Sequence, residues 1–121
     1  DLVHHTHPKA VCYADPSEWD YFEATVCSTV HVILPMGLNW AANNILEHNA
    51  HHVDPRVPLY NLPDAQARLE TAYPEEIAVE RLTPWYVLRI LRTCRLYDYP
   101  RRQWLDYDGT PTTPALRPDA S

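Results

Sequence analysis

The longest apolar stretch of the chain lies between Glu23 and Glu47, where 23 consecutive residues carry no formal charge. A helix of this length could cross a bilayer. Pro35 and Gly37 interrupt it, however, and its histidine and asparagine side chains are costly to place against lipid. The pattern therefore predicts two helices, at residues 17–34 and 38–51, that lie inside a larger helical bundle or at a membrane interface.

Two further helices are predicted from the positions of prolines and capping residues. Pro63 suits the first turn of a helix that stops before the next proline. Thr83 as the N-cap and Pro84 at the first helical position predict a last helix that reaches about Tyr97. Beyond it lies a polar, proline-rich tail at residues 100–121, whose last dozen residues we expect to be disordered. The predicted fold class is therefore all-α, with extended, proline-rich connections.

Charge is unevenly distributed along the chain. The net charge is −6, from 10 basic and 16 acidic residues, which argues against a uniformly basic nucleic-acid-binding protein. Within the last predicted helix, however, Arg89, Arg92 and Arg95 recur every three residues. A basic amphipathic helix of this kind suits an anionic membrane surface. A solvent-exposed face on a helix packed against its own domain explains the pattern equally well, and both interpretations stay open.

Six of the seven histidines fall in two tight clusters, the first of which is an HxxHH box formed by His48, His51 and His52. On a helix the second and third of these lie three and four positions after the first, so all three imidazoles emerge on one side. Imidazole is a ligand for zinc, iron, copper and nickel. The box therefore predicts a metal site, to which Asn44, four residues earlier, could add a contact.

The second cluster contains His4, His5 and His7, ahead of the apolar stretch. In an extended chain His5 and His7 point the same way and His4 points elsewhere, so this cluster could supply further metal ligands. His31, alone on an apolar segment, is interpreted as a hydrogen-bonded residue inside the bundle. The sequence contains no HExxH motif and no carboxylate-rich ExxH pair, which excludes the patterns of zinc proteases and of soluble ferritin-like di-iron proteins.

The order of these motifs resembles a known family. Along the chain come HTHP at residues 5–8, SEWD at 17–20, the histidine box at 48–52, VPLY at 57–60 and TPWY at 83–86. This order is similar to the C-terminal part of membrane-bound fatty acid desaturases, and within them to the acyl-lipid omega-6/omega-3 (delta-12/delta-15) branch. The resemblance covers about residues 2–98 and implies the distal part of a helical membrane-protein bundle.

The resemblance also implies a histidine-coordinated centre of two iron ions on the cytosolic side of the membrane. Such enzymes use O₂ and two electrons, delivered by ferredoxin or cytochrome b5, to remove two hydrogens from a fatty acyl lipid. The position of His4 is usually a glutamine in this family, so the resemblance gives that residue no clear role. The implied metal ligands are His5, His48, His51 and His52, with weaker candidates for contact to the metal or its water at His7 and Asn44.

The family's first two histidine boxes and its preceding membrane-spanning helices have no counterpart here, and the chain does not begin with methionine. We therefore expect residues 1–99 to be the C-terminal part of a desaturase domain and residues 100–121 to be its tail. We expect this segment to be inactive alone. Bulky apolar residues on the helix before the box are candidates for lining the acyl-chain site: Leu38, Trp40 and Ile45.

Three other functions fit the same residues. A related membrane hydroxylase or ketolase uses the same histidine boxes, because the outcome depends on how the substrate is placed. A non-catalytic, membrane-associated module would hold a metal such as zinc without oxidising a lipid. A helical interaction protein with incidental histidines would bind no metal at all.

Overall fold

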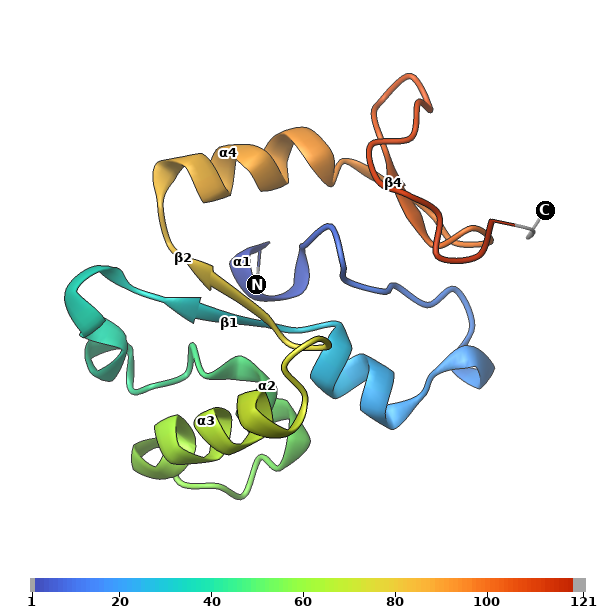
Figure 1. Ribbon diagram of the computed structural model, residues 1–121. Helices are drawn as coiled ribbons and strands as arrows, with labels where there is room; N and C mark the ends of the chain where they lie inside the picture. Colours follow the sequence, from blue (N-terminus) through green and yellow to red (C-terminus); the bar gives the residue numbers. More distant parts are fainter. Residues whose placement is uncertain (1, 119–121) are drawn as a thin grey trace.

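The computed structural model describes residues 2–118 and places a two-stranded parallel sheet at its centre (Figure 1). Strand β1 (Val30–Ile33) pairs with β2 (Ala78–Arg81). Alternate side chains of β1, those of Val30 and Val32, are almost fully buried and form the hydrophobic core with apolar residues of the neighbouring segments. The sheet is the platform on which the histidine-bearing helices are arranged.

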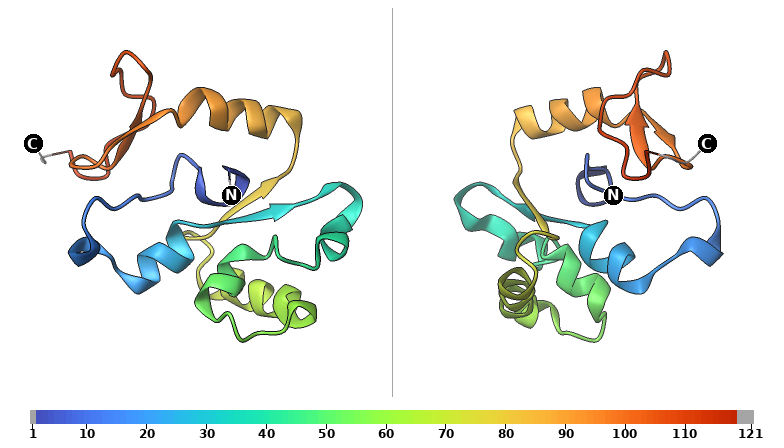
Figure 2. Two further views of the ribbon diagram at one scale, coloured as in Figure 1. Left: turned by 180° about the vertical axis from the view of Figure 1, so that it is seen from behind. Right: turned by 45° about the vertical axis from the view of Figure 1, so that its right-hand side comes forward.

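Helices cover both sides of this sheet (Figures 1 and 2). Helices α2 (His48–Val53) and α3 (Leu62–Ala72) pack together on one side, and α4 (Pro84–Thr93) lies on the other. The four-residue helix α1 (Leu2–His5) lies between the sheet and α4, where a tyrosine hydroxyl of α4 donates to an α1 carbonyl oxygen at 2.9 Å. Both histidine clusters are therefore close to β1.

The prediction of a helix at residues 17–34 is wrong. This segment forms a short 3₁₀ turn at Pro16–Glu18, a π-helical turn at Glu23–Cys27 and then strand β1. The β1 sequence is rich in β-branched residues, which pack well on a pleated surface. Its partner β2 comes from a distant part of the chain, so the pairing that selects the strand cannot be read from the local pattern.

The prediction of a continuous helix at residues 38–51 is also wrong. A 3₁₀ segment at Pro35–Ala42 is separated from α2 by five residues, the first two of which are in the left-handed region: Asn43 with φ of 53° and Asn44 with φ of 55°. Asparagine adopts this conformation more readily than most residues. Helix α2 therefore begins only at His48, and Asn44 lies outside it.

Helices α3 and α4 confirm the predictions made from proline and capping positions. Pro63 lies in the first turn of α3, and the hydroxyl of Thr83 accepts the backbone N–H of Tyr86 at 3.0 Å to cap α4. Helix α4 ends at Thr93, four residues earlier than expected, because the chain then turns into strand β3 (Leu96–Asp98).

The C-terminal tail is ordered over its described part. Strand β4 (Gln103–Leu105) pairs with β3 in an antiparallel hairpin. The indole N–H of Trp104 donates to a backbone carbonyl of the N-terminal segment at 2.9 Å, and the buried guanidinium of Arg102 pairs with Glu23 at 3.0 Å. Residues 119–121, which the disorder prediction also covered, lie outside the described residues.

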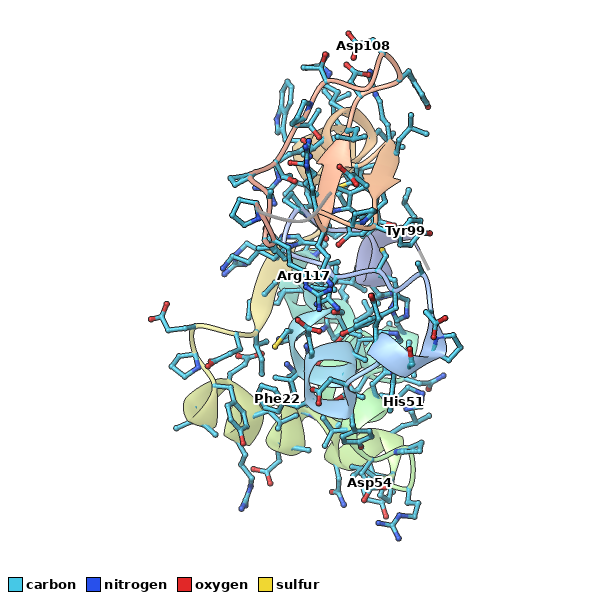
Figure 3. All side chains as sticks on the ribbon, turned by 90° about the vertical axis from the view of Figure 1, so that its right-hand side faces the viewer. Phe22, His51, Asp54, Tyr99, Asp108 and Arg117 are labelled. Carbon is cyan, nitrogen blue, oxygen red and sulfur yellow. The ribbon has the colours of Figure 1, made fainter. Side chains whose placement is uncertain are left out.

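The all-α prediction is therefore wrong, because two small sheets and several short helical turns replace the expected helical bundle. Among residues 2–118, no helix is long and apolar enough to cross a membrane. Figure 3 shows the turn that follows β4, marked by Asp108, at the opposite end of the molecule from α2 and the residue after it, where His51 and Asp54 are labelled.

Packing of the tail leads to a stability prediction. Trp104 is 8% exposed, and its indole is hydrogen-bonded, so Trp104→Ala removes a large buried side chain together with the hydrogen bond that its indole donates. We expect this variant to lose about 3–5 kcal/mol of unfolding free energy, measured by urea denaturation. The control is Leu116→Ala in the same tail, where the side chain is 57% exposed and the expected change is within about 0.5 kcal/mol. Equal stability of both variants would show that the tail does not pack against the domain.

Candidate metal centre

Two short helices bring three histidines together. Helix α2 begins at His48, so His48 and His52 lie one turn apart on the same face, and α1 carries His5 towards them. The Nε2 atom of His48 lies 3.0 Å from the Nε2 atom of His5 and 3.0 Å from that of His52. One ring nitrogen from each of the three residues falls within 4.8 Å of the others.

These separations match the spacing of imidazoles around a metal ion. Bonds from imidazole nitrogen to zinc are about 2.0–2.1 Å, which places two nitrogens on one ion about 2.9–3.4 Å apart. The two 3.0 Å separations at His48 fall in this range. Three neutral imidazoles are also a donor set that suits iron or zinc. The residues present therefore fit a bound transition-metal ion.

The backbone determines which ring nitrogen of His48 carries a proton. Its Nδ1 lies 3.1 Å from the carbonyl oxygen of Ile45, which can only accept a hydrogen bond. Nδ1 must therefore donate, so the neutral ring keeps its free lone pair on Nε2, facing His5 and His52. Histidines that bind metals commonly make this second hydrogen bond, which sets the tautomer and orients the ring.

Burial keeps the three imidazoles uncharged at neutral pH. The pKa of His48 is lowered to about 3, chiefly by desolvation and also by the neighbouring imidazoles, against the raising effect of the hydrogen bond to the Ile45 carbonyl. The pKa of His5 and that of His52 are also lowered, in each case first by burial. Because a metal ion binds only the unprotonated ring, these groups are ready to bind without first releasing a proton.

The same shifts predict how stability depends on pH. An unfolded histidine takes up a proton near pH 6.5, whereas folded His48 does so only near pH 3. Between these values the unfolded state binds more protons, so the metal-free chain loses stability as the pH falls below about 6.5. We expect the midpoint of urea unfolding to decrease from pH 7.5 to pH 5, and to decrease less in a His48→Gln variant. A midpoint that rises on acidification would contradict burial of a neutral His48.

His4 is a member of the cluster that the sequence did not predict. Its ring stacks on that of His48, with centroids 4.5 Å apart and an interplanar angle of 29°. Its Nε2 atom is buried and has no hydrogen-bond partner among the described residues. Burial lowers the pKa of His4 to about 4. An unpaired, neutral imidazole nitrogen beside three others is a further sign that the cluster fits a metal ion.

The remaining candidate residues lie at different distances from this cluster. The ring centre of His51 is 5.9 Å from that of His48 and 5.8 Å from that of His52, at the edge of the cluster. His7 lies elsewhere, because its buried ring contacts Glu80 through Nε2 at 3.2 Å. The side-chain amide of Asn44 donates to a backbone carbonyl in the segment before α3, at 3.1 Å.

The three residues predicted to line an acyl-chain site lie on the segment before α2. Trp40 is 68% exposed, whereas Leu38 and Ile45 are half-buried. The neighbouring Met36 is 90% exposed, so this uncharged segment presents large apolar side chains on the surface. Only Ile45 touches the histidine cluster directly, through its carbonyl oxygen.

Comparison with known proteins gives consistent matches. The family model described as "Fatty acid desaturase" matches residues 1–84. The chain is 32% identical over 98 residues to the chloroplastic omega-6 fatty acid desaturase of Spinacia oleracea, covering 80% of this chain and 22% of that protein. It is 30% identical over 98 residues to the sn-1 oleoyl-lipid 12-desaturase of a Picosynechococcus species, covering 80% of this chain and 28% of that protein.

A bacterial relative matches over almost the whole chain. The fatty acid desaturase of Bacillus subtilis is 28% identical over 121 residues, which is 98% of this chain and 32% of that protein. The match therefore includes the C-terminal hairpin as well as both histidine clusters. In all three comparisons the chain spans less than a third of the relative's length.

Proposed function

Because the chain belongs to the fatty acid desaturase family, we propose that it carries part of the iron centre of an O₂-dependent acyl-lipid desaturase. The observation that supports this most directly is the convergence of three neutral imidazoles, from α1 and α2, within 4.8 Å. Their close spacing and the fixed tautomer of His48 suit a resident metal better than they suit three incidental surface histidines.

In this proposal His5, His48 and His52 would hold one iron ion through ring nitrogens, and His51 would be a ligand to a second ion. When bound, the two iron ions would supply O₂ activation and the oxidising power needed to remove hydrogen from an unactivated methylene group. The polypeptide contributes orientation and charge control. The Ile45 carbonyl fixes the His48 ring, and burial lowers the pKa of His48 and so favours its unprotonated form.

We further propose that the acyl chain approaches over the uncharged segment before α2, along Leu38, Trp40 and Ile45. The support is that this segment exposes large apolar side chains, while the backbone of Ile45 contacts a proposed ligand. Apolar surface of this kind favours contact with hydrocarbon. Ferredoxin or cytochrome b5 is proposed as the electron donor.

The proposed setting is a membrane, with α4 at the headgroup level. Of the three arginines expected to face headgroups, Arg89 is paired with Glu80 and Arg95 with Asp106. Arg92 is exposed, as are Trp85 and Leu91 on the same helix. An exposed cation beside exposed apolar side chains suits the boundary between anionic headgroups and acyl chains.

Since the chain spans 22% to 32% of the relatives' lengths, we propose that further ligands come from a longer polypeptide. The missing first two histidine boxes would complete the di-iron centre. Residues 1–99 would then form the distal part of the desaturase domain. On this proposal the chain binds iron by itself but does not desaturate lipid.

An anaerobic titration of the 121-residue chain with Fe²⁺ tests the metal centre. We expect about one tightly bound ion per chain, through the three converging imidazoles. In a host that expresses the complete enzyme, gas chromatography of membrane acyl chains should show a new double bond, whereas a new hydroxyl group would indicate the related hydroxylase. Absence of iron binding by the wild-type chain would contradict the proposed centre.

A further inference from the structure

A set of five polar side chains, three of them buried, links α2 to α3 and to β1. Two of its members, Glu47 and Asn49, are the direct neighbours of His48 in the sequence. The other members lie on α3 and β1. We call this set the polar ring; it consists of Glu47, Asn49, Gln66, Glu70 and His31.

Gln66 ties α3 to α2. Its amide N–H groups donate to the Asn49 side chain at 3.2 Å and to Glu70 at 2.9 Å, and its oxygen accepts the backbone N–H of Ala50 at 3.0 Å. Gln66 is 1% exposed and Asn49 is fully buried. One side chain therefore satisfies three groups, two of them on the helix that carries the histidine box.

Asn49 and His31 extend the polar ring to the segment that forms β1. The Asn49 amide donates to the backbone carbonyls of Val26 and Thr29, at 2.9 and 3.0 Å. His31, on β1, contacts Glu70 through Nδ1 at 2.5 Å. These contacts join α2 to the segment before β1, and α3 to β1 itself.

Glu47 closes the polar ring at the start of α2. Glu47 is 6% exposed, and one oxygen of its carboxylate accepts a hydrogen bond from the Asn39 amide at 3.1 Å. The other oxygen is buried and has no hydrogen-bond partner among the described residues. The same amide donates to the carbonyl of Val32 in β1 at 3.0 Å. Nε2 of His31 lies 4.0 Å from the Glu47 carboxylate. Of the two sequence neighbours of His48, Glu47 is therefore linked to β1 through Asn39, and Asn49 is bonded to the segment just before β1.

We propose that the polar ring is a positioning device for the metal centre, which fixes the rotation of α2 and so holds His48 within 3.0 Å of His5 and His52. This inference rests on the proposed metal centre. Rotation of α2 would leave the buried amides of Asn49 and Gln66 unpaired, which is costly, so the ring favours the observed orientation. Metal ligands need such support, because small displacements weaken a site.

The test is metal affinity in a Gln66→Met variant of the full chain. Methionine keeps the side-chain volume but removes the contacts to Asn49, Glu70 and Ala50. We expect Co²⁺ affinity to fall about 10–100-fold, the range found when the outer partners of metal ligands are lost. The visible absorption of bound Co²⁺ should also change, since it reports ligand geometry. A Glu70→Ala variant, which breaks the ring at a partly exposed residue, should show a smaller loss in the same direction.

The matched control is Ile90→Val, which reduces the packing of a fully buried residue on α4, away from the polar ring. It lowers stability without touching α2, so its Co²⁺ affinity should stay within about twofold of wild type. Wild-type affinity in Gln66→Met, or an equal loss in Ile90→Val, would overturn the positioning role while leaving the metal centre intact. A wild-type chain that binds no metal would overturn the proposed function and this inference together.

Discussion

We expect a His48→Ala variant to lose iron binding by more than about 100-fold, and to abolish desaturation in the complete enzyme. His48 is the central residue of the proposed ligand set, since its Nε2 lies 3.0 Å from the Nε2 atoms of both His5 and His52. Its removal therefore takes away both of these short nitrogen–nitrogen separations. Loss of the outer partners of a ligand already costs about 10–100-fold in affinity, and loss of the ligand itself costs more. Competition with an Fe²⁺ chelator measures the affinity, and gas chromatography measures the product.

The control for this prediction is another buried histidine. His7→Gln removes an imidazole outside the cluster, and glutamine can still donate to Glu80. We expect this variant to keep the iron affinity of the wild type. Equal losses in the two variants would show that the histidines stabilise the fold rather than bind iron, and normal product from His48→Ala would refute the ligand assignment.

Elements with local signals could be predicted from the sequence. The start of α4 depends on a threonine cap and a following proline, both of which act within one turn of the helix. The start of α3 similarly depends on Pro63. Strand β1 has no comparable signal, because its partner β2 is far along the chain and the apolar run around it also fits a helix.

The C-terminal hairpin likewise cannot be predicted from the local sequence, because distant residues stabilise it. Its composition of prolines and polar residues is typical of flexible tails, but Trp104 and Arg102 find partners in the N-terminal part of the domain. A tryptophan in an otherwise polar tail was the available signal, since burial of one aromatic side chain provides substantial stabilisation.

The histidine cluster could be predicted in part. The HxxHH spacing indicates a shared face on any helix, so the closeness of His48 and His52 follows from the sequence. The approach of His5 depended on the family resemblance, because the packing of α1 is a tertiary feature. The supporting residues Asn49 and Gln66 could not be identified, since buried amides leave no periodic pattern and are recognised only by their partners.

We expect His51→Ala to abolish desaturation as His48→Ala does, but through loss of the second proposed iron ion rather than the first. The ring of His51 lies 5.9 Å from that of His48 and outside the three converging nitrogens, so its removal leaves the first ion's ligands in place. We expect iron content in the complete enzyme to fall from about two ions to about one per chain, with desaturation abolished, because two-metal chemistry needs both ions. Elemental analysis and product measurement on the same preparation test this. Loss of both ions would place His51 in the first site, and near-normal product would remove it from the metal centre altogether.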